Sequence, residues 1–130
     1  MSSKQIQVFY ELEIIPGKAD ELLDIARQMV AFNDAGEPNT QVYNVYINDD
    51  QTLLTYWETH ADSAAMLYHA ERFANGDFIG QVVERTQGAR LCLYGDVSEE
   101  MKTWVINNGF EVEYFDYISK NVTPRHLNYY

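Results

Sequence analysis

The sequence predicts a ferredoxin-like α+β fold in which strands and helices follow the order βαββαβ. The first observation is that the spacing of apolar residues switches repeatedly between a period of two and a helical period. The second is that Pro-Gly, Asn-Gly and clusters of Asn and Asp separate these segments, as turns and helix ends require. The third is the order of the segments, which gives an antiparallel sheet with both helices on one face.

The first half of the chain predicts a strand, a helix and a hairpin. Apolar residues alternate over 5–15, which indicates a strand that Pro16 and Gly17 end. Apolar residues then recur at helical spacing until a run of loop-forming residues follows. The runs 41–47 and 52–58 are rich in β-forming residues, and the four residues between them favour a turn.

The next part predicts a second helix and a fourth strand. Past His60 the period becomes helical, and Asp62 is placed to cap the helix. Asp77 is placed to cap a further helical segment, and Gly88 releases the chain into a strand over 89–94.

Residues 96–130 extend the chain beyond the βαββαβ unit. Within them Ser98 caps an expected helix, and 110–118 alternates as a fifth strand. We expect that strand to extend the edge of the sheet or to cross to a partner, and Tyr129 and Tyr130 to dock on a neighbour. We assign residues 1–130 to one domain, because a chain of 130 residues supports one core of ordinary size.

Composition excludes several classes of function. The 20 acidic and 9 basic residues give a formal charge of −11, which repels nucleic acid and anionic membrane surfaces. The single cysteine, Cys92, forms no intramolecular disulfide. No signal peptide and no apolar run of about 18 residues occur, so we expect a cytoplasmic protein with no membrane or nucleic-acid partner.

The candidate catalytic residues are Glu58, His60 and His69. Strand alternation places Tyr56, Glu58 and His60 on one face, and His69 lies on the inward face of the next helix. A histidine titrates near neutral pH, and a neighbouring carboxylate fixes its tautomer, so the three suit acid-base chemistry. The structural alternative is an exposed Glu58, a loop His60 and a core His69 bonded to a backbone carbonyl.

Three further residues are candidates for binding a substrate. Tyr56 is placed to orient a substrate oxygen, and Glu11 and Arg90 reach the same space if their strand parity matches. The histidines and the cysteine show no pair at metal-ligand spacing, and no nucleotide-binding glycine motif occurs. We therefore expect neither a metal nor another cofactor.

The face of the sheet that lacks helices predicts a homodimer. We expect it to carry Phe9 or Tyr10, together with Tyr56, an apolar surface that a monomer would expose to water. Two such sheets packed face to face bury that surface by two-fold symmetry. If Tyr56, Glu58 and His60 point into the space between the two sheets, we expect the pocket for a small aromatic molecule to lie there.

The region from Glu58 to His69 resembles antibiotic-biosynthesis-type monooxygenases, a dimeric α/β-barrel family. Their strand-helix pattern is Glu-x-Trp-x-Ser-x-x-Ala-Leu-x-x-His, and here Glu58, Ala65, Met66 and His69 fall at its spacing. His60 replaces the tryptophan of the pattern and Asp62 replaces its serine. The segment Ile-Pro-Gly-Lys near the N-terminus is also similar to the strand end of that family.

The resemblance implies a dimeric α/β barrel and a cofactor-independent monooxygenase that oxidises a quinol-like or polycyclic phenolic molecule. In that scheme His69 or His60 is the base, Glu58 orients it, and Tyr56 donates a hydrogen bond to the developing oxyanion. The loss of the tryptophan favours the alternative, a small-molecule-binding or sensing dimer of the same fold without catalysis.

Overall fold

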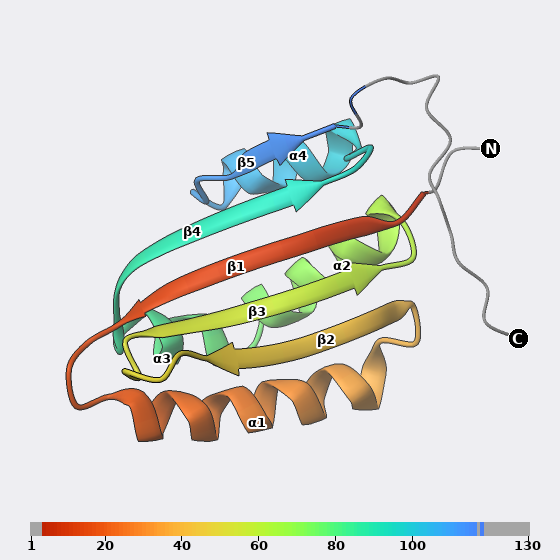
Figure 1. Cartoon of the computed structure of the whole chain (residues 1–130). Helices are drawn as coiled ribbons and strands as arrows, with labels where there is room; N and C mark the ends of the chain where they lie inside the picture. Colours follow the sequence, from red (N-terminus) through yellow and green to blue (C-terminus); the bar gives the residue numbers. More distant parts are fainter. Residues whose placement is uncertain (1–3, 117, 119–130) are drawn as a thin grey trace, which may run out of the picture.

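The computed structural model describes residues 4–116 and residue 118, and its centre is a five-stranded sheet (Figure 1). The strands are β1 (Ile6–Ile14), β2 (Thr40–Ile47), β3 (Leu53–His60), β4 (Thr86–Tyr94) and β5 (Glu113–Phe115). The helices are α1 (Ala19–Gly36), α2 (Ser63–Ala74), α3 (Phe78–Val83) and α4 (Glu99–Asn107). The predicted ferredoxin-like order, followed by a helix and a strand, is confirmed.

The strand order across the sheet is β2-β3-β1-β4-β5. β1 pairs antiparallel with β3 and β4, so Val8 lies opposite both Glu58 and Leu93. In the same register Glu11 lies opposite Arg90. Because directly paired residues share a face, the even-numbered residues of β1 lie with Glu58, and the odd-numbered residues lie with Arg90.

The helices cover one face of this sheet, and the core lies between them and the strands (Figure 1). Two groups of buried side chains fill that space. Each fully buried Leu, Ile or Val stabilises the fold by roughly 1.5–3 kcal/mol relative to an exposed one. The group under α1 includes Leu12, Leu22, Ile25, Leu54, Tyr56 and Phe73, and the group under α4 includes Ile6, Val8, Met66, Leu93, Met101 and Val105.

The C-terminal extension completes the second group. Ser98 caps α4, since its side chain accepts a hydrogen bond from the Met101 N–H at 3.1 Å. The Ser98 N–H donates to Ser63 Oγ at 2.9 Å, which ties the start of α4 to the start of α2. β5 runs parallel to β4 at the sheet edge, so of the two expected positions for the fifth strand the edge is the observed one.

Three local expectations differ from the structure. The fifth strand was expected over 110–118 but spans Glu113–Phe115, and residues 117 and 119–130, with Tyr129 and Tyr130, lie outside the described residues. β4 begins at Thr86 rather than after Gly88, because Gly88 pairs with Glu13 of the long strand β1. Asp77 makes no side-chain cap, because its backbone (φ −84°, ψ 0°) is not in the extended conformation of a capping residue.

None of the helices in the described part of the chain is long and apolar enough to cross a membrane.

Candidate functional site

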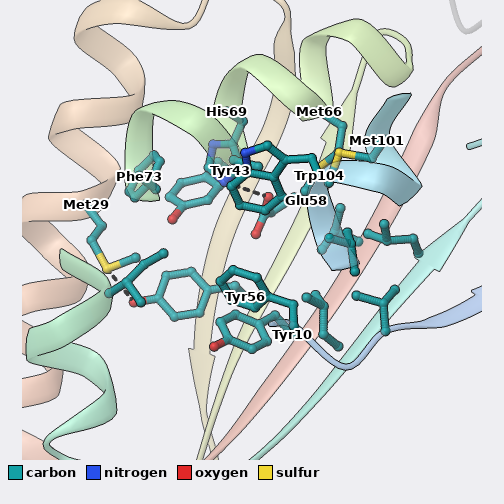
Figure 2. Close-up of a pocket in the computed structure, with 18 of the residues that line it drawn as sticks. Tyr10, Met29, Tyr43, Tyr56, Glu58, Met66, His69, Phe73, Met101 and Trp104 are labelled. Carbon is teal, nitrogen blue, oxygen red and sulfur yellow. Dashed lines mark hydrogen bonds and ion pairs between the residues drawn. The ribbon is translucent and has the colours of Figure 1, made fainter. Parts of the chain in front are cut away.

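A cavity of about 90 Å³ lies between the sheet and the helices (Figure 2). Most of its wall is aliphatic or aromatic, and of the described residues that line it only Glu58 carries a carboxylate and only His69 an imidazole. An apolar pocket with few polar groups is typical of small-molecule sites. Its lining includes Val8, Tyr10, Tyr43, Tyr56, Met66, Phe73, Leu93, Met101, Trp104 and Val105.

The condition for a pocket between two sheets is not met by the candidate residues of β3. Tyr56, Glu58 and His60 do not point into a space between two sheets, because all three are buried on the helix-covered face. Tyr10 also points to that face and lines the cavity, so it is Phe9 that lies on the open face beside Trp57. The site is therefore enclosed within one chain.

Glu58, His60 and His69 meet at the wall of this cavity. β3 places Glu58 and His60 two residues apart on one face, and Glu58 Oε1 lies 2.9 Å from His60 Nε2. His69 comes from α2, whose start is fixed by the Asp62 side chain accepting from the Ala65 N–H at 2.8 Å. Its Nε2 lies 3.2 Å from the same Glu58 oxygen, and a dashed line marks this contact in Figure 2.

The other ring nitrogens of both histidines contact a second pair of side chains. His69 Nδ1 lies 2.7 Å from Glu37 Oε1, and His60 Nδ1 lies 3.2 Å from Thr40 Oγ1. The Thr40 hydroxyl lies 3.2 Å from Glu37 Oε1. The contacts therefore form a closed loop of five side chains. We call these five side chains, Glu37, Thr40, Glu58, His60 and His69, the buried ring.

Arg72 joins the buried ring to the protein surface. Its Nη1 donates to Glu37 Oε2 at 2.8 Å and to the Phe32 carbonyl at 3.2 Å. The guanidinium stacks over the Phe32 ring, with 3.9 Å from its carbon to the ring centre. Gly36 allows this approach, because a Cβ at that position would clash with the guanidinium.

The charges in the buried ring stabilise one another. Burial alone would lower the pKa of His69, but the negative charge of Glu58 and the hydrogen bond to Glu37 together raise it. Burial alone would raise the pKa of Glu37, but its contacts with His69 and then Arg72 lower it. Both shifts favour an ionised carboxylate beside a protonated imidazole.

Tyrosines line the cavity close to Glu58. Tyr56 is buried, and its hydroxyl donates to Met29 Sδ at 3.2 Å, which Figure 2 also shows. Burial, and then the negative charge of Glu58, raise the pKa values of Tyr56, Tyr43 and Tyr10. These tyrosines therefore keep their protons near neutral pH and can act as hydrogen-bond donors.

Glu11 and Arg90 do not reach this cavity. They face each other across β1 and β4 on the open face of the sheet, where Arg90 forms an exposed pair with Glu113. Of the predicted substrate-binding residues, only Tyr56 therefore lies at the pocket. The parity of β1 and β4, which the sequence left open, decides this.

The sequence shows no residues at metal-ligand spacing, but the fold brings three possible metal ligands close together. One ligand atom each from Glu58, His60 and His69 lies within 4.8 Å of the other two. Carboxylate oxygen and imidazole nitrogen are ligands for zinc and non-haem iron, so the donor types fit such an ion. A bound ion would take the place of the direct contacts that now join both Nε2 atoms to Glu58 Oε1.

Sequence reasoning missed Glu37, Thr40 and Arg72. Glu37 lies in the run of loop-forming residues that follows α1, and Arg72 lies on α2 among ordinary helix residues. A buried acidic residue in a loop has no local signature. Only the long-range approach of Glu37 to His69, across 32 positions of the chain, reveals its role.

Several solved protein structures share the fold of this chain. No protein-family model and no curated protein sequence matches the chain. Among solved structures, MupZ from Pseudomonas fluorescens aligns over 96% of this chain and 99% of its own, with a TM-score of 0.73 and 15% identity. The chain has this fold.

Shorter neighbours support the resemblance to the monooxygenases. A putative antibiotic biosynthesis monooxygenase from Caulobacter crescentus aligns over 70% of this chain and 88% of its own, with a TM-score of 0.61 and 20% identity. A structure of an antibiotic biosynthesis monooxygenase covers 72% of this chain and 99% of its own, with a TM-score of 0.60 and 21% identity. At these identities the comparison establishes a shared fold.

Proposed function

We propose that this protein binds a phenol-like small molecule in the cavity and oxidises it with molecular oxygen, using Glu58 as the base. The observation that carries the proposal is the position of Glu58, the one carboxylate among the described residues of a mostly apolar wall. The fold shared with antibiotic biosynthesis monooxygenases supports the type of reaction.

The geometry favours Glu58 over either histidine as the base. His69 Nδ1 lies 2.7 Å from Glu37 Oε1 and 3.4 Å from Asn33 Nδ2, and its Nε2 lies 3.2 Å from Glu58 Oε1. The raised pKa of His69 favours the protonated ring, which donates to both carboxylates and is a poor base. His60 faces Glu58 on one side and Thr40 on the other. Glu58 Oε2, in contrast, receives no hydrogen bond from the described part of the chain and is the atom left for a ligand.

The proposed reaction needs little from the protein. Glu58 takes a proton from a group whose ordinary pKa is about 10, as for a phenol, and the resulting anion is electron-rich enough to react with oxygen. In an anthrone, an activated CH₂ group then becomes C=O and the second oxygen atom leaves as water; in a hydroquinone, one ring C–H becomes C–OH, the two hydroxyls are oxidised to the quinone, and the second oxygen atom again leaves as water. The four electrons that reduce oxygen come from the substrate, so hydrogen, oxygen and electrons balance.

The tyrosines give the pocket donors for the substrate anion. Tyr10 and Tyr43 line the cavity with protonated hydroxyls, and Tyr56 is held by its bond to Met29. A donor to a developing oxyanion contributes roughly 3 kcal/mol in other enzymes. Two histidines that hold Glu58 Oε1 keep its second oxygen oriented, which lowers the cost of aligning the base.

Oxygen uptake with a panel of hydroquinones and anthrones tests this function. We expect uptake by the parent protein and a loss of about 100-fold or more in Glu58→Gln, the usual scale for a lost general base. The matched control is Glu11→Gln, the same change on the open face, which should keep full activity.

Two outcomes would change the proposal. Equal activity in Glu58→Gln and Glu11→Gln would remove Glu58 as the base. If the parent binds members of the panel, seen by quenching of its tyrosine and tryptophan fluorescence, but consumes no oxygen, a non-catalytic binding or sensing role replaces the enzyme.

A further inference from the structure

We propose that Trp104, on the C-terminal extension, determines the specificity of the cavity: it limits the ligand to a single aromatic ring, which lies against the indole. That this ring belongs to a phenol, such as a hydroquinone, rests on the proposed function. The size limit does not, because it follows from the volume and the lining of the cavity, and it can be tested without turnover.

The C-terminal extension supplies one wall of the cavity. α4 lies behind β4 and β5 in Figure 1. Side chains of both groups of buried residues line the cavity, which therefore lies where the core under α1 meets the core under α4. The extension contributes Met101, Trp104 and Val105 from α4, and Phe110 and Val112 from the segment after it.

The end of α4 fixes the position of Trp104. The Asn108 side chain donates to the Trp104 carbonyl at 2.8 Å. Gly109, with a φ of +73°, turns the chain back, and the Phe110 N–H donates to the Val105 carbonyl at 3.1 Å. This return stacks the Phe110 ring on the indole, with 5.6 Å between ring centres and 18° between the ring planes. The stacked pair gives the indole a preferred orientation.

Trp104 also forms part of the rim of the cavity. It is half-buried, whereas Met101 and Val105 on the same helix are buried. A side chain packed on all sides has no space to move into, but a half-buried one can shift towards water. Trp104 is the one tryptophan among the described residues of the lining and their largest side chain, and Figure 2 shows its indole among them. Its position therefore sets how far a ligand can extend.

The volume of the cavity decides what fits beside the indole. The cavity measures about 90 Å³, and a cavity of about 150 Å³ holds benzene in another protein. One ring therefore enters after a small shift of the rim, whereas a fused ring system needs the space that the indole occupies. Because the described lining is mostly apolar and carries one carboxylate, Glu58, it suits a ring with a polar substituent.

The two tryptophans of the chain test where the ligand binds. Trp57 is 45% exposed on the open face of the sheet, whereas Trp104 lines the cavity. In Trp57→Phe, hydroquinone should quench the remaining tryptophan emission in a saturable manner. In Trp104→Phe, the same concentrations should cause no saturable quenching. The reverse pattern would overturn the proposal.

Isothermal titration calorimetry tests the size limit with two pairs of probes. Hydroquinone and anthrone are the phenol-like pair, and benzene and naphthalene have similar shapes without a hydroxyl. In the parent the smaller member of each pair should bind about tenfold or more tightly, although the larger one has more apolar surface to bury.

Replacement of the indole should remove that preference. In Trp104→Leu the affinity for hydroquinone should fall about three- to tenfold, the scale of one aromatic contact, while the affinity for anthrone should rise about tenfold or more. The matched control is Trp57→Leu, the same change on the open face, which should keep the affinity ratios of the parent.

Two results would contradict the size limit. One is an unchanged ratio of anthrone to hydroquinone affinity in Trp104→Leu, and the other is a parent that binds the larger member of each pair more tightly. If Trp104→Leu does not fold, Trp104→Phe decides, because it trims the same wall and should shift the ratio in the same direction.

The outcomes also separate this proposal from the proposed function. Size selection in a protein that consumes no oxygen, or that binds benzene but not hydroquinone, would contradict the proposed function and leave the role of Trp104 intact. Oxygen uptake that depends on Glu58, with the same preference for ring size in Trp104→Leu as in the parent, would contradict the role of Trp104 alone.

Discussion

Two ion pairs of almost the same length lie in different surroundings, one on the open face of the sheet and one between α2 and the end of α1. On the open face Arg90 Nε lies 2.7 Å from Glu113 Oε2, and the side chains are 55% and 50% exposed. Between α2 and the end of α1, Arg72 Nη1 lies 2.8 Å from Glu37 Oε2, and the side chains are 20% and 1% exposed. The two ion pairs have similar lengths but differ in burial. Water screens the charges of the exposed pair, whereas the charges of the buried pair are stabilised only by neighbouring protein groups.

The apolar residues of the two faces differ in the same way. On the helix face Tyr56 and Leu54 are buried, while on the open face Trp57 is 45% exposed beside Phe9, with Tyr46 on the neighbouring strand also exposed. Exposed aromatic patches of this kind mark interaction surfaces. The predicted homodimer, formed through this face, stays a prediction.

The largest expected effect concerns that open face. If two copies pack sheet to sheet, Trp57→Glu places a charge in the interface and should weaken the dimer about 100-fold or more, the scale of a central aromatic anchor. Val83→Glu is the matched control, because Val83 is exposed on α3, away from this face. Sedimentation at micromolar concentration measures both, and a parent protein that sediments as a folded monomer would contradict the dimer.

A smaller effect separates the two arginines. Arg72→Met keeps the packing against Phe32 but leaves Glu37 without its cation, and should lower the free energy of unfolding by about 2 kcal/mol. Arg90→Met breaks an exposed pair and should cause no measurable change. Urea denaturation of both variants compares them, and equal losses would show that burial does not distinguish the pairs.

The smallest expected effect is a dependence of stability on pH that comes from the buried ring. The pKa of His69 is raised above its ordinary 6.5, so its stabilisation is complete below about pH 6.5 and is lost as pH rises through the folded value. The pKa of Glu37 is lowered below its ordinary 4.5, so its stabilisation is present above that pH and is lost as pH falls through the folded value.

Urea midpoints measured from pH 4 to 9 should therefore be highest between about pH 4.5 and 6.5. One titrating group changes stability by at most about 1.4 kcal/mol per pH unit, so the decline above pH 6.5 is gradual. The variant His69→Gln should lose that decline. A parent that becomes more stable from pH 6.5 to 8 would contradict the raised pKa of His69.

The sequence alone determined the order of the elements and the membership of each strand face. Alternation along β3 put Tyr56, Glu58 and His60 together, and the cap at Asp62 with the helical period turned His69 inward. These are local properties, because the period of a strand or helix depends on neighbouring residues. The meeting of Glu58 with both histidines follows from them once β3 runs directly into α2.

Only the tertiary structure decided which strand face the helices cover, and thereby where the pocket lies. Alternation gives two faces but does not say which one is buried, so the sequence placed Tyr56 on the open face and left the parity of Glu11 and Arg90 undetermined. In the structure Tyr56 and Glu58 line the cavity under the helices, and Glu11 and Arg90 lie on the other face. The tertiary structure also brings Glu37 to the site, because the end of α1 packs against α2, a segment distant in sequence. A carboxylate that is removed from water needs hydrogen-bond donors from the protein. The tertiary structure determines which donors lie near it, so the partners of Glu37 and Glu58 could not be predicted from the sequence.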